Sequence, residues 1–251
     1  MPSPPEERLR VGLLIPSSNT VLEAALWRRF PAWATLHPTR LYVTESSDAA
    51  VRGIHDAIPE AARLLGTLRP HLIVVGCTSV SGVGEGSLED ELAPAIEATT
   101  GAPVLAVLPS VVTSVRALGC RRLVLVTPHG EDVDALVIRG LARSGVEVSA
   151  IHNMGIRDNF ELGRVPPAEI VRFVVDRVPP RVGAEGLFLS CTNFQSVEAL
   201  PALRQRYGGR VLSSVGVLVD RTLEELGRLR SRGVVGAGSR AEPREGGQHG
   251  T

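Results

Sequence analysis

Lysine is absent from this chain of 251 residues, so all 27 of its basic residues are arginine. A Schiff base between a protein and pyridoxal phosphate or a carbonyl substrate needs a lysine amine, and so does the phosphate-binding loop of P-loop nucleotide hydrolases. The composition therefore excludes both kinds of chemistry for groups that this chain supplies.

A surplus of charge of either sign is also missing. The 27 basic residues are balanced by 27 acidic ones, and aromatic residues make up only 4% of the chain. Nucleic-acid-binding domains usually carry a basic surplus, often with aromatic side chains on which bases stack. The composition therefore predicts that the protein has no nucleic-acid partner.

The apolar stretches are short. Leu72 to Val75 is typical of them, and it is far below the roughly 20 apolar residues that a membrane-spanning helix needs. The segment from Met1 to Arg8 is rich in proline and acidic residues and has no apolar core of the kind found in signal peptides. We therefore expect a cytoplasmic protein with no membrane partner.

Cysteine is scarce, with three widely spaced residues: Cys77, Cys120 and Cys191. An odd number without a C-x-x-C pair predicts neither a disulfide framework nor a zinc site, and the histidines are too isolated to suggest one. The segment 81–86 has the spacing G-x-G-x-G rather than G-x-G-x-x-G, and no acidic residue follows the next strand. We read that segment as a turn and expect no metal and no cofactor.

Strand-length β-branched runs alternate with longer helical patterns, which is typical of parallel strands joined by crossover helices. The expected strands are 11–15, 72–76, 104–108, 123–126, 146–151, 187–189 and 211–212. The expected helices are 20–29, 55–68, 88–99, 111–118, 132–144, 167–178, 197–207 and 218–230. The pattern predicts an α/β fold.

The two halves of the chain resemble each other. In the first half, one strand leads into the turn 16–19 and another into Cys77; in the second half, one strand leads into the turn 127–130 and another into Cys191. We therefore predict two pseudo-symmetric Rossmann-like lobes with parallel sheets and the active site between them. Lobe one is expected to comprise 9–110 and about 213–231, and lobe two 111–212. The segments 1–8 and 232–251 are expected to be disordered.

Cys77 and Cys191 each end a buried strand and begin a polar turn. Backbone N–H groups in such a turn favour an anion, so they can hold a carboxylate and lower the pKa of a thiol. A single cysteine of this kind is most simply a small buried apolar residue. Two at matching strand ends favour a catalytic pair instead. Cys120 has no counterpart, and we expect it to be structural.

Three further residues stand out, two of which, Asn19 and His129, lie in turns that follow predicted strands. Asn19 and Asn159 could contact a substrate or simply cap a helix or a turn. His129 occupies the position in the second half that corresponds to the turn 16–19 in the first half. An imidazole there either contacts the substrate or fills space, and its usual pKa of about 6.5 would let its charge change near neutral pH.

Four motifs carry a family resemblance: VGLLIPSSNT at 11–20, GCTS at 76–79, VTP at 126–128 and SCT at 190–192. Together they are similar to the aspartate/glutamate racemase superfamily, and most of all to its maleate cis-trans isomerase and arylmalonate decarboxylase branch, over roughly residues 10–230. The resemblance implies two Rossmann-like lobes around a cofactor-free site in which cysteine acts as nucleophile, acid or base.

Taken position by position, the resemblance implies that Cys77 is the nucleophile and Cys191 its partner. It implies that carboxylate groups are bound by the side chains of Asn19 and Asn159 and by the backbone N–H groups of Thr78, Ser79 and Thr192. Two departures stand out: His129 replaces a tyrosine that is usual in this branch, and no asparagine follows the serines at 213–214.

The resemblance therefore implies a cofactor-independent isomerase of a small carboxylic acid, of the maleate type. Racemisation of amino acids or hydantoins and decarboxylation of malonate-like acids are the rival reactions. A two-lobed small-molecule binding protein is the alternative that is not an enzyme. We expect a homodimer, because two-fold dimers are the commonest oligomers.

Overall fold

The computed structural model describes residues 8–86, 88–179 and 185–233, so most of the two expected disordered segments lies outside the described residues. The strands are β1 (Leu9–Pro16), β2 (Ala34–Leu41), β3 (Leu72–Val75), β4 (Val104–Ala106), β5 (Arg122–Thr127), β6 (Glu147–Asn153), β7 (Gly186–Leu189) and β8 (Val211–Ser213). The α-helices are α1 (Leu22–Trp27), α2 (Asp48–Gly66), α3 (Leu88–Thr100), α4 (Val107–Ala117), α5 (Glu131–Arg143), α6 (Pro167–Arg177), α7 (Ser196–Tyr207) and α8 (Ser214–Ser231). Two 3₁₀ turns, η1 (Ser79–Gly82) and η2 (Glu161–Arg164), complete the elements.

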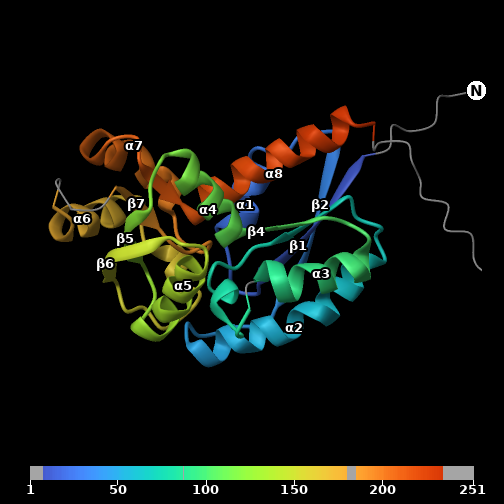
Figure 1. Cartoon of the computed structure of the whole chain (residues 1–251), viewed down its shortest axis with the longest axis horizontal. Helices are drawn as coiled ribbons and strands as arrows, with labels where there is room; N and C mark the ends of the chain where they lie inside the picture. The colour runs from blue at the N-terminus through green and yellow to red at the C-terminus, as the bar shows by residue number, and fades with distance from the viewer. Residues whose placement is uncertain (1–7, 87, 180–184, 234–251) are drawn as a thin grey trace, which may run out of the picture.

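The strands form two four-stranded sheets, ordered β2-β1-β3-β4 and β6-β5-β7-β8. Every strand pair within them is parallel. The strand order is the same in both halves once the numbering is shifted by four. The predicted α/β fold with two similar parallel sheets is therefore confirmed, and Figure 1 shows the sheets in separate parts of the elongated molecule.

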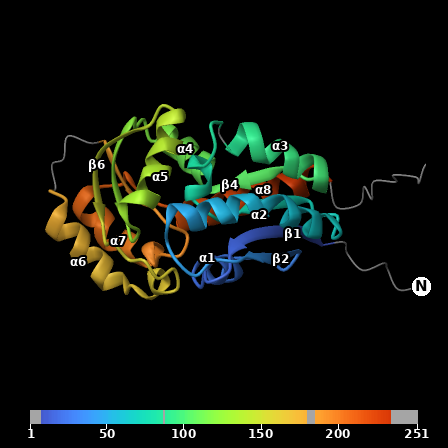
Figure 2. The same ribbon diagram turned by 90° about the horizontal axis from the view of Figure 1, so that it is seen from below.

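Helices cover both faces of each sheet, as parallel sheets require. In the first sheet, alternate residues of β1 and β3 face a core built with α2 and α3. In the second sheet, alternate residues of β5 and β7 face a core built with α6 and α7. Figure 2 shows α6 and α7 at one end of the molecule, while α2 lies along the half that contains β1 and β2.

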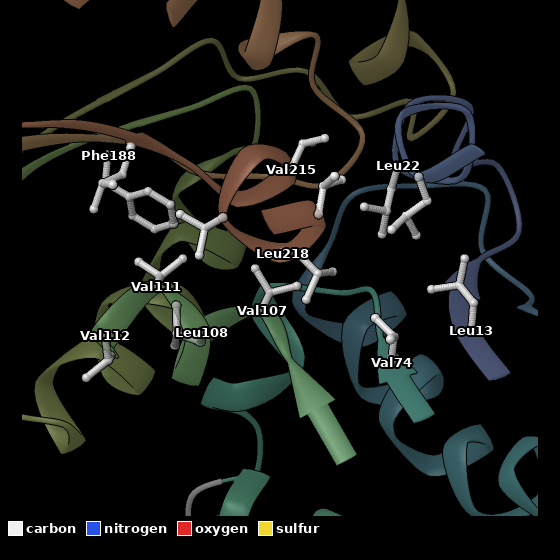
Figure 3. Close-up of a cluster of buried hydrophobic side chains, with 14 of the residues drawn as sticks. Leu13, Leu22, Val74, Val107, Leu108, Val111, Val112, Phe188, Val215 and Leu218 are labelled. Atoms are coloured by element: carbon white, nitrogen blue, oxygen red, sulfur yellow. The ribbon is translucent and has the colours of Figure 1, made fainter. Parts of the chain in front are cut away.

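The inner faces of the two sheets share one continuous core. Leu13 and Val74 of the first sheet, Phe188 of the second, and residues of α4 and α8 such as Val111 and Leu218 belong to one buried cluster. Figure 3 shows these side chains converging from elements far apart in the sequence. The two halves are therefore packed together through apolar side chains.

Strand β2 was not expected from the sequence. Its segment ATLHPTRL contains Pro38, and a proline normally argues against a strand because it cannot donate a backbone hydrogen bond. The structure places β2 at the edge of its sheet, where it pairs with β1 alone. A proline N atom is tolerated at such an edge.

Three predicted helix starts were wrong by four residues or more: the helix expected over 55–68 begins at Asp48, and the other two lie where a strand meets a helix. The apolar run Val104–Leu108 reads as one strand, but the strand ends at Ala106 and α4 begins at Val107. The helix expected over 218–230 begins at Ser214, with the Ser213 hydroxyl accepting the Gly216 N–H at 3.0 Å as its cap. In both places a buried strand passes directly into a buried helix, so the apolar pattern shows no break.

The expected division between the lobes at 110/111 falls within α4, and this division stays a proposal. Within the residues that the structure describes, none of the helices is both long and apolar enough to span a bilayer.

Candidate active site

A cavity lies where the carboxyl ends of the central strands β1, β3 and β7 meet the turn that follows β5. In each sheet the chain runs outward in opposite directions from one point, between β1 and β3 in the first sheet and between β5 and β7 in the second. Open α/β sheets bind ligands at such points. The space between its atoms, including the part that is open to solvent, is about 420 Å³. The lining residues are Pro16, Asn19, Val43, Glu45, Ser46, Val51, Ile54, Cys77, Thr78, Ser79, His129, Val133, Asn159, Cys191, Thr192 and Asn193.

All eight site residues predicted from the sequence line this cavity, from both halves of the chain. They are Asn19, Cys77, Thr78, Ser79, His129, Asn159, Cys191 and Thr192. The structure therefore places all eight residues at one cavity, while their roles in binding and catalysis stay predictions. Cys120 lies away from the cavity, with its Sγ atom 3.4 Å from the carbonyl oxygen of Glu185.

Asn19 both caps a helix and faces the cavity. Its Oδ1 atom accepts the N–H groups of Val21 and Leu22, each at 3.0 Å, which fixes the start of α1. Its Nδ2 atom donates to the hydroxyl of Thr192 at 3.1 Å, and that hydroxyl donates to the carbonyl of Gly76 at 2.9 Å. The two roles considered for Asn19 are therefore compatible, and the side chain joins the two lobes.

Asn159 is held by neighbours from both halves of the chain. Its Nδ2 atom donates to the hydroxyl of Ser18 at 2.6 Å. The backbone carbonyl of Asn159 accepts a hydrogen bond from the side-chain amide of Asn193 at 2.7 Å. The side chain of Asn193 also reaches the first half of the chain, because its Oδ1 atom accepts the N–H of Thr20 at 3.0 Å. These bonds give the Asn159 side chain a defined orientation at the cavity.

Ser214 joins the two cysteine turns. Its hydroxyl oxygen accepts the N–H of Cys191 at 3.1 Å and the hydroxyl of Thr78 at 3.1 Å. Cys191 has a backbone φ of 142°, a region that side chains other than glycine rarely adopt. Strain of this kind is characteristic of functional turns, and here it directs the cysteine at the end of β7 into the cavity.

Burial raises the pKa of the thiol of Cys77 and of the thiol of Cys191. N–H groups oppose this effect without overcoming it: those of Ser79 and Val80 face Cys77, and that of Asn193 donates to the Cys191 Sγ at 3.2 Å. The turns therefore act on the thiol pKa in the expected direction, but burial outweighs them and the net shift is upward. A charge on Cys77 would raise the pKa of Cys191 further, so the titrations of the two thiols are electrostatically coupled.

His129 is a buried, neutral imidazole. Burial lowers its pKa to about 4, although the nearby carboxylate of Asp132 acts in the opposite direction. The expectation that its charge changes near neutral pH is therefore wrong, because desolvation disfavours the imidazolium. The Nδ1 atom lies 3.0 Å from the hydroxyl oxygen of Ser46, which the sequence did not single out.

A short contact between the lobes encloses this side of the cavity. Glu45 and Asp158 form an antiparallel bridge, flanked by backbone hydrogen bonds from the N–H of Ser46 to the Arg157 carbonyl at 2.6 Å and from the N–H of Asn159 to the Thr44 carbonyl at 3.0 Å. The loop after β2 and the loop after β6 are thus held together, which positions Ser46 beside His129.

Asp132 strengthens this contact between the lobes. One of its carboxylate oxygens pairs with Arg157 at 2.6 Å, and the other accepts the N–H of Asp48 at the start of α2 at 3.0 Å. These bonds, together with the guanidinium charge, hold the pKa of Asp132 below its usual value against a contrary effect of burial.

A second carboxyl group lies buried behind the site. Asp134 accepts the hydroxyl of Thr127 at 2.6 Å and the side-chain amide of Asn153 at 2.9 Å, which ties the ends of β5 and β6 together. Burial raises the pKa of Asp134 to about 6. The charge of this carboxylate also contributes to the raised pKa of Cys191.

The sequence did not reveal the apolar wall of the cavity, which is formed by Val43, Val51, Ile54 and Val133. Their apolar spacing indicated burial but not which cavity they would face. Among the lining residues that the structure describes there is no arginine, so neutral N–H and O–H donors are the groups available to bind an anion.

The residues that the structure describes contain no group of three or more His, Cys, Asp or Glu side chains that could hold a metal ion. The expectation that no cofactor is used stays a prediction.

The comparisons with known proteins agree with this architecture. The model of the arylmalonate decarboxylase family matches residues 11–229. The chain is similar to the maleate isomerase of Geobacillus stearothermophilus, with 24% identity over 234 residues that cover 88% of this chain and 92% of the relative. It is also similar to the arylmalonate decarboxylase of Bordetella bronchiseptica, with 25% identity over 81% of this chain and 85% of the relative.

Solved structures have the same fold. The maleate cis-trans isomerase of Nocardia farcinica bound to TRIS superimposes with a TM-score of 0.78 and 23% identity, over 87% of this chain and 93% of that one. The resemblance inferred from the four sequence motifs is thus confirmed. Because the family model covers all four motifs and both sheets, the chain belongs to the arylmalonate decarboxylase family.

Proposed function

We propose that the protein is a cofactor-independent isomerase of a small dicarboxylic acid that converts maleate to fumarate. The observation that carries this proposal is the meeting of Cys77 and Cys191, one from each half of the chain, at one cavity lined by neutral hydrogen-bond donors. Two curated relatives named maleate isomerase, from Geobacillus stearothermophilus and Nocardia farcinica, support it at 24% and 26% identity. A solved Nocardia farcinica mutant carries a covalently bound succinylcysteine intermediate.

The carboxylate groups of the substrate would be bound by donors that carry no charge. The backbone N–H groups of Thr78 and Thr192 have no acceptor among the residues that the structure describes, and both lie at the cavity. Asn19 and Asn159 supply amide groups beside them. A well-placed donor of this kind stabilises developing negative charge by on the order of 3 kcal/mol.

The proposed reaction is an addition followed by an elimination. The Cys77 sulfur bonds to one alkene carbon of maleate while its proton passes to water. The π electrons move toward the neighbouring carbon and its carboxylate, and Cys191 delivers its proton to that carbon and becomes a thiolate. Rotation about the new single bond follows. The Cys191 thiolate then removes a proton from carbon, and the C–S bond breaks with its electrons returning to the Cys77 sulfur. Cys77 takes a proton back from water, so fumarate is released and both thiols are restored. Atoms and electrons balance without an oxidant or a metal.

The raised thiol pKa values fit this scheme. Burial keeps both cysteines neutral, so each can donate a proton. A racemase would use the two thiols as opposed acid and base at a single carbon. A decarboxylase of malonate-like acids would need a thiol only to protonate the carbanion. Both rivals would share the donors that bind the carboxylate.

An NMR assay in D₂O with maleate, malonates, amino acids and hydantoins distinguishes these reactions. We expect fumarate from maleate, with Cys77→Ala and Cys191→Ala each reducing turnover at least a hundredfold while the circular dichroism spectrum is unchanged. Cys120→Ala, which alters a cysteine outside the cavity, is the matched control and should keep wild-type turnover. Solvent deuterium at the α-carbon of an amino acid, or loss of CO₂ from a malonate, without any fumarate would overturn the proposal.

We also propose that the enzyme works in the cytoplasm as a homodimer. All three cysteines are free, and a reducing compartment keeps them so. Sedimentation analysis would test the oligomeric state.

A further inference from the structure

Ser46 and His129 form a buried pair across the two lobes. Their side chains approach to 3.0 Å between the hydroxyl oxygen and Nδ1, and the two residues are only 3% and 6% exposed. Within the described residues, neither side chain has another hydrogen-bond partner, and both line the cavity. The Nε2 atom of His129 is therefore the ring nitrogen left for a ligand.

A neutral imidazole carries one proton, and the hydrogen bond made by one nitrogen decides where that proton sits. If Nδ1–H donated to Ser46, the serine hydroxyl proton would have no acceptor within the described residues, and Nε2 would present a lone pair to an anionic substrate. If the Ser46 hydroxyl donates to Nδ1, its proton is used and Nε2 carries a proton that can be donated. The second arrangement leaves no buried donor unpaired.

We propose that Ser46 is a positioning residue: its hydroxyl donates to Nδ1 of His129 and thereby holds the proton on Nε2, where it is donated to a carboxylate oxygen of the substrate. The pair thus presents one neutral N–H donor to the cavity. The charged group that raises the pKa of His129 against burial is Asp132, whose carboxylate is paired with Arg157 and with the N–H of Asp48. The imidazole is thus not needed to neutralise Asp132.

The first test is independent of any substrate. ¹⁵N chemical shifts of imidazole distinguish the two neutral tautomers, and the six histidines of the chain can be sorted by the signal that disappears in His129→Gln. At pH 7.5 we expect the wild-type protein to show His129 with its proton on Nε2. We expect Ser46→Ala to lose that single tautomer and Ser46→Thr, which keeps a hydroxyl, to restore it.

Ser47→Ala is the matched control for this measurement. The Ser47 hydroxyl caps α2 by accepting the N–H of Ala50 at 3.1 Å, so its removal weakens a neighbouring helix start without touching His129. The His129 tautomer should be unchanged in this variant. A proton on Nδ1 in the wild-type protein, or a tautomer that is the same in Ser46→Ala, would overturn the inference.

The second test rests on the proposed function and uses maleate. Loss of one hydrogen bond to a charged group costs about tenfold or more in binding, so Ser46→Ala should raise KM about tenfold, with a smaller change in kcat. Ser46→Thr should return KM to within about twofold of wild type. Unchanged KM in Ser46→Ala would overturn the role in carboxylate binding. Absence of turnover by the wild-type protein would overturn the proposed function but leave the tautomer measurement to decide on Ser46.

Discussion

Burial, more than the ordinary pKa of an imidazole, decides the charge of His129. Because its pKa lies at about 4, the imidazole is neutral throughout the range from pH 6 to pH 8. We predict that the ratio of KM values for wild type and His129→Gln is constant over this range, since neither side chain changes its charge there. Steady-state kinetics at five pH values would measure it. A ratio that changes near pH 6.5 would show that the site is more hydrated than its geometry indicates.

Asp134 makes a separate prediction about stability. Its pKa is raised from 3.8 to about 6 in the folded protein, so between these values the folded state keeps a proton that the unfolded state has lost. The contribution of Asp134 to the free energy of unfolding therefore falls as pH rises from about 4 to 6, by up to about 3 kcal/mol. It is constant above that range.

Urea unfolding of wild type and Asp134→Asn measures this contribution, because the amide does not titrate. The stability of the variant relative to wild type should increase from pH 4 to pH 6 and then level off. A difference that stays the same at every pH would contradict a raised pKa for Asp134.

At the level of single residues, the sequence identified the site through the ends of strands. Cys77, Cys191 and His129 could be predicted because each follows an apolar run at the point where parallel strands place ligands. Ser46 could not, because it contacts His129 across 83 positions of sequence through a loop that follows an unexpected strand. Its only local signal is the pair of serines before α2, which indicates a helix cap.

Among the elements, the 3₁₀ turn η1 depends most directly on a close approach of backbones. A Cβ atom on Gly82 would lie 1.8 Å from the carbonyl oxygen of Leu136 in α5. We predict that Gly82→Ala lowers the free energy of unfolding by about 2 kcal/mol or more, since backbone atoms cannot yield as a side chain can. Turnover should also fall, because η1 carries the Ser79 and Val80 N–H groups that face Cys77.

Gly53→Ala provides the control for this substitution. Gly53 lies on the exposed face of α2, where an added Cβ atom meets nothing within 4 Å. Alanine is the better helix former, so this variant should gain up to about 1 kcal/mol in stability and keep full activity. Equal effects of the two substitutions in chemical unfolding would contradict the packing of η1 against α5.

Elements were predictable where a turn separates them and not where burial is continuous. Gly119 and Gly145 mark helix ends with positive φ angles, and both were expected from the sequence. By contrast, β4 passes into α4 without an intervening polar residue, and periodicity over so few residues cannot locate the change.

The whole molecule has two sheets but one central core. Since Leu13, Phe188 and Leu218 belong to a single buried cluster (Figure 3), neither half can unfold without exposing the apolar face of the other. We predict one cooperative unfolding transition in urea. The two tryptophans, Trp27 and Trp33, lie in the first half, whereas circular dichroism reports helices of both halves. The two signals should therefore change at the same urea concentration. Separate midpoints would show that the halves are independently stable.

At this scale the internal repeat was the informative signal. It predicted two similar parallel sheets with their strand ends at a shared site, because the polar turns recur at matching places in both halves. The shared central core could not be predicted in the same way, since α4 and α8 contact one another across about a hundred residues and their apolar faces do not reveal which partner they cover.

The most direct test of the proposed isomerase is to trap its covalent adduct. Cys191→Ser lacks the thiol that removes the proton from carbon, so an adduct of Cys77 with maleate that has taken its proton from water cannot eliminate and should accumulate. Intact-protein mass spectrometry should then show a gain equal to one maleate, mapped to the peptide that contains Cys77 and absent from the Cys77→Ala, Cys191→Ser double variant. No adduct, or an adduct on Cys120, would contradict the account.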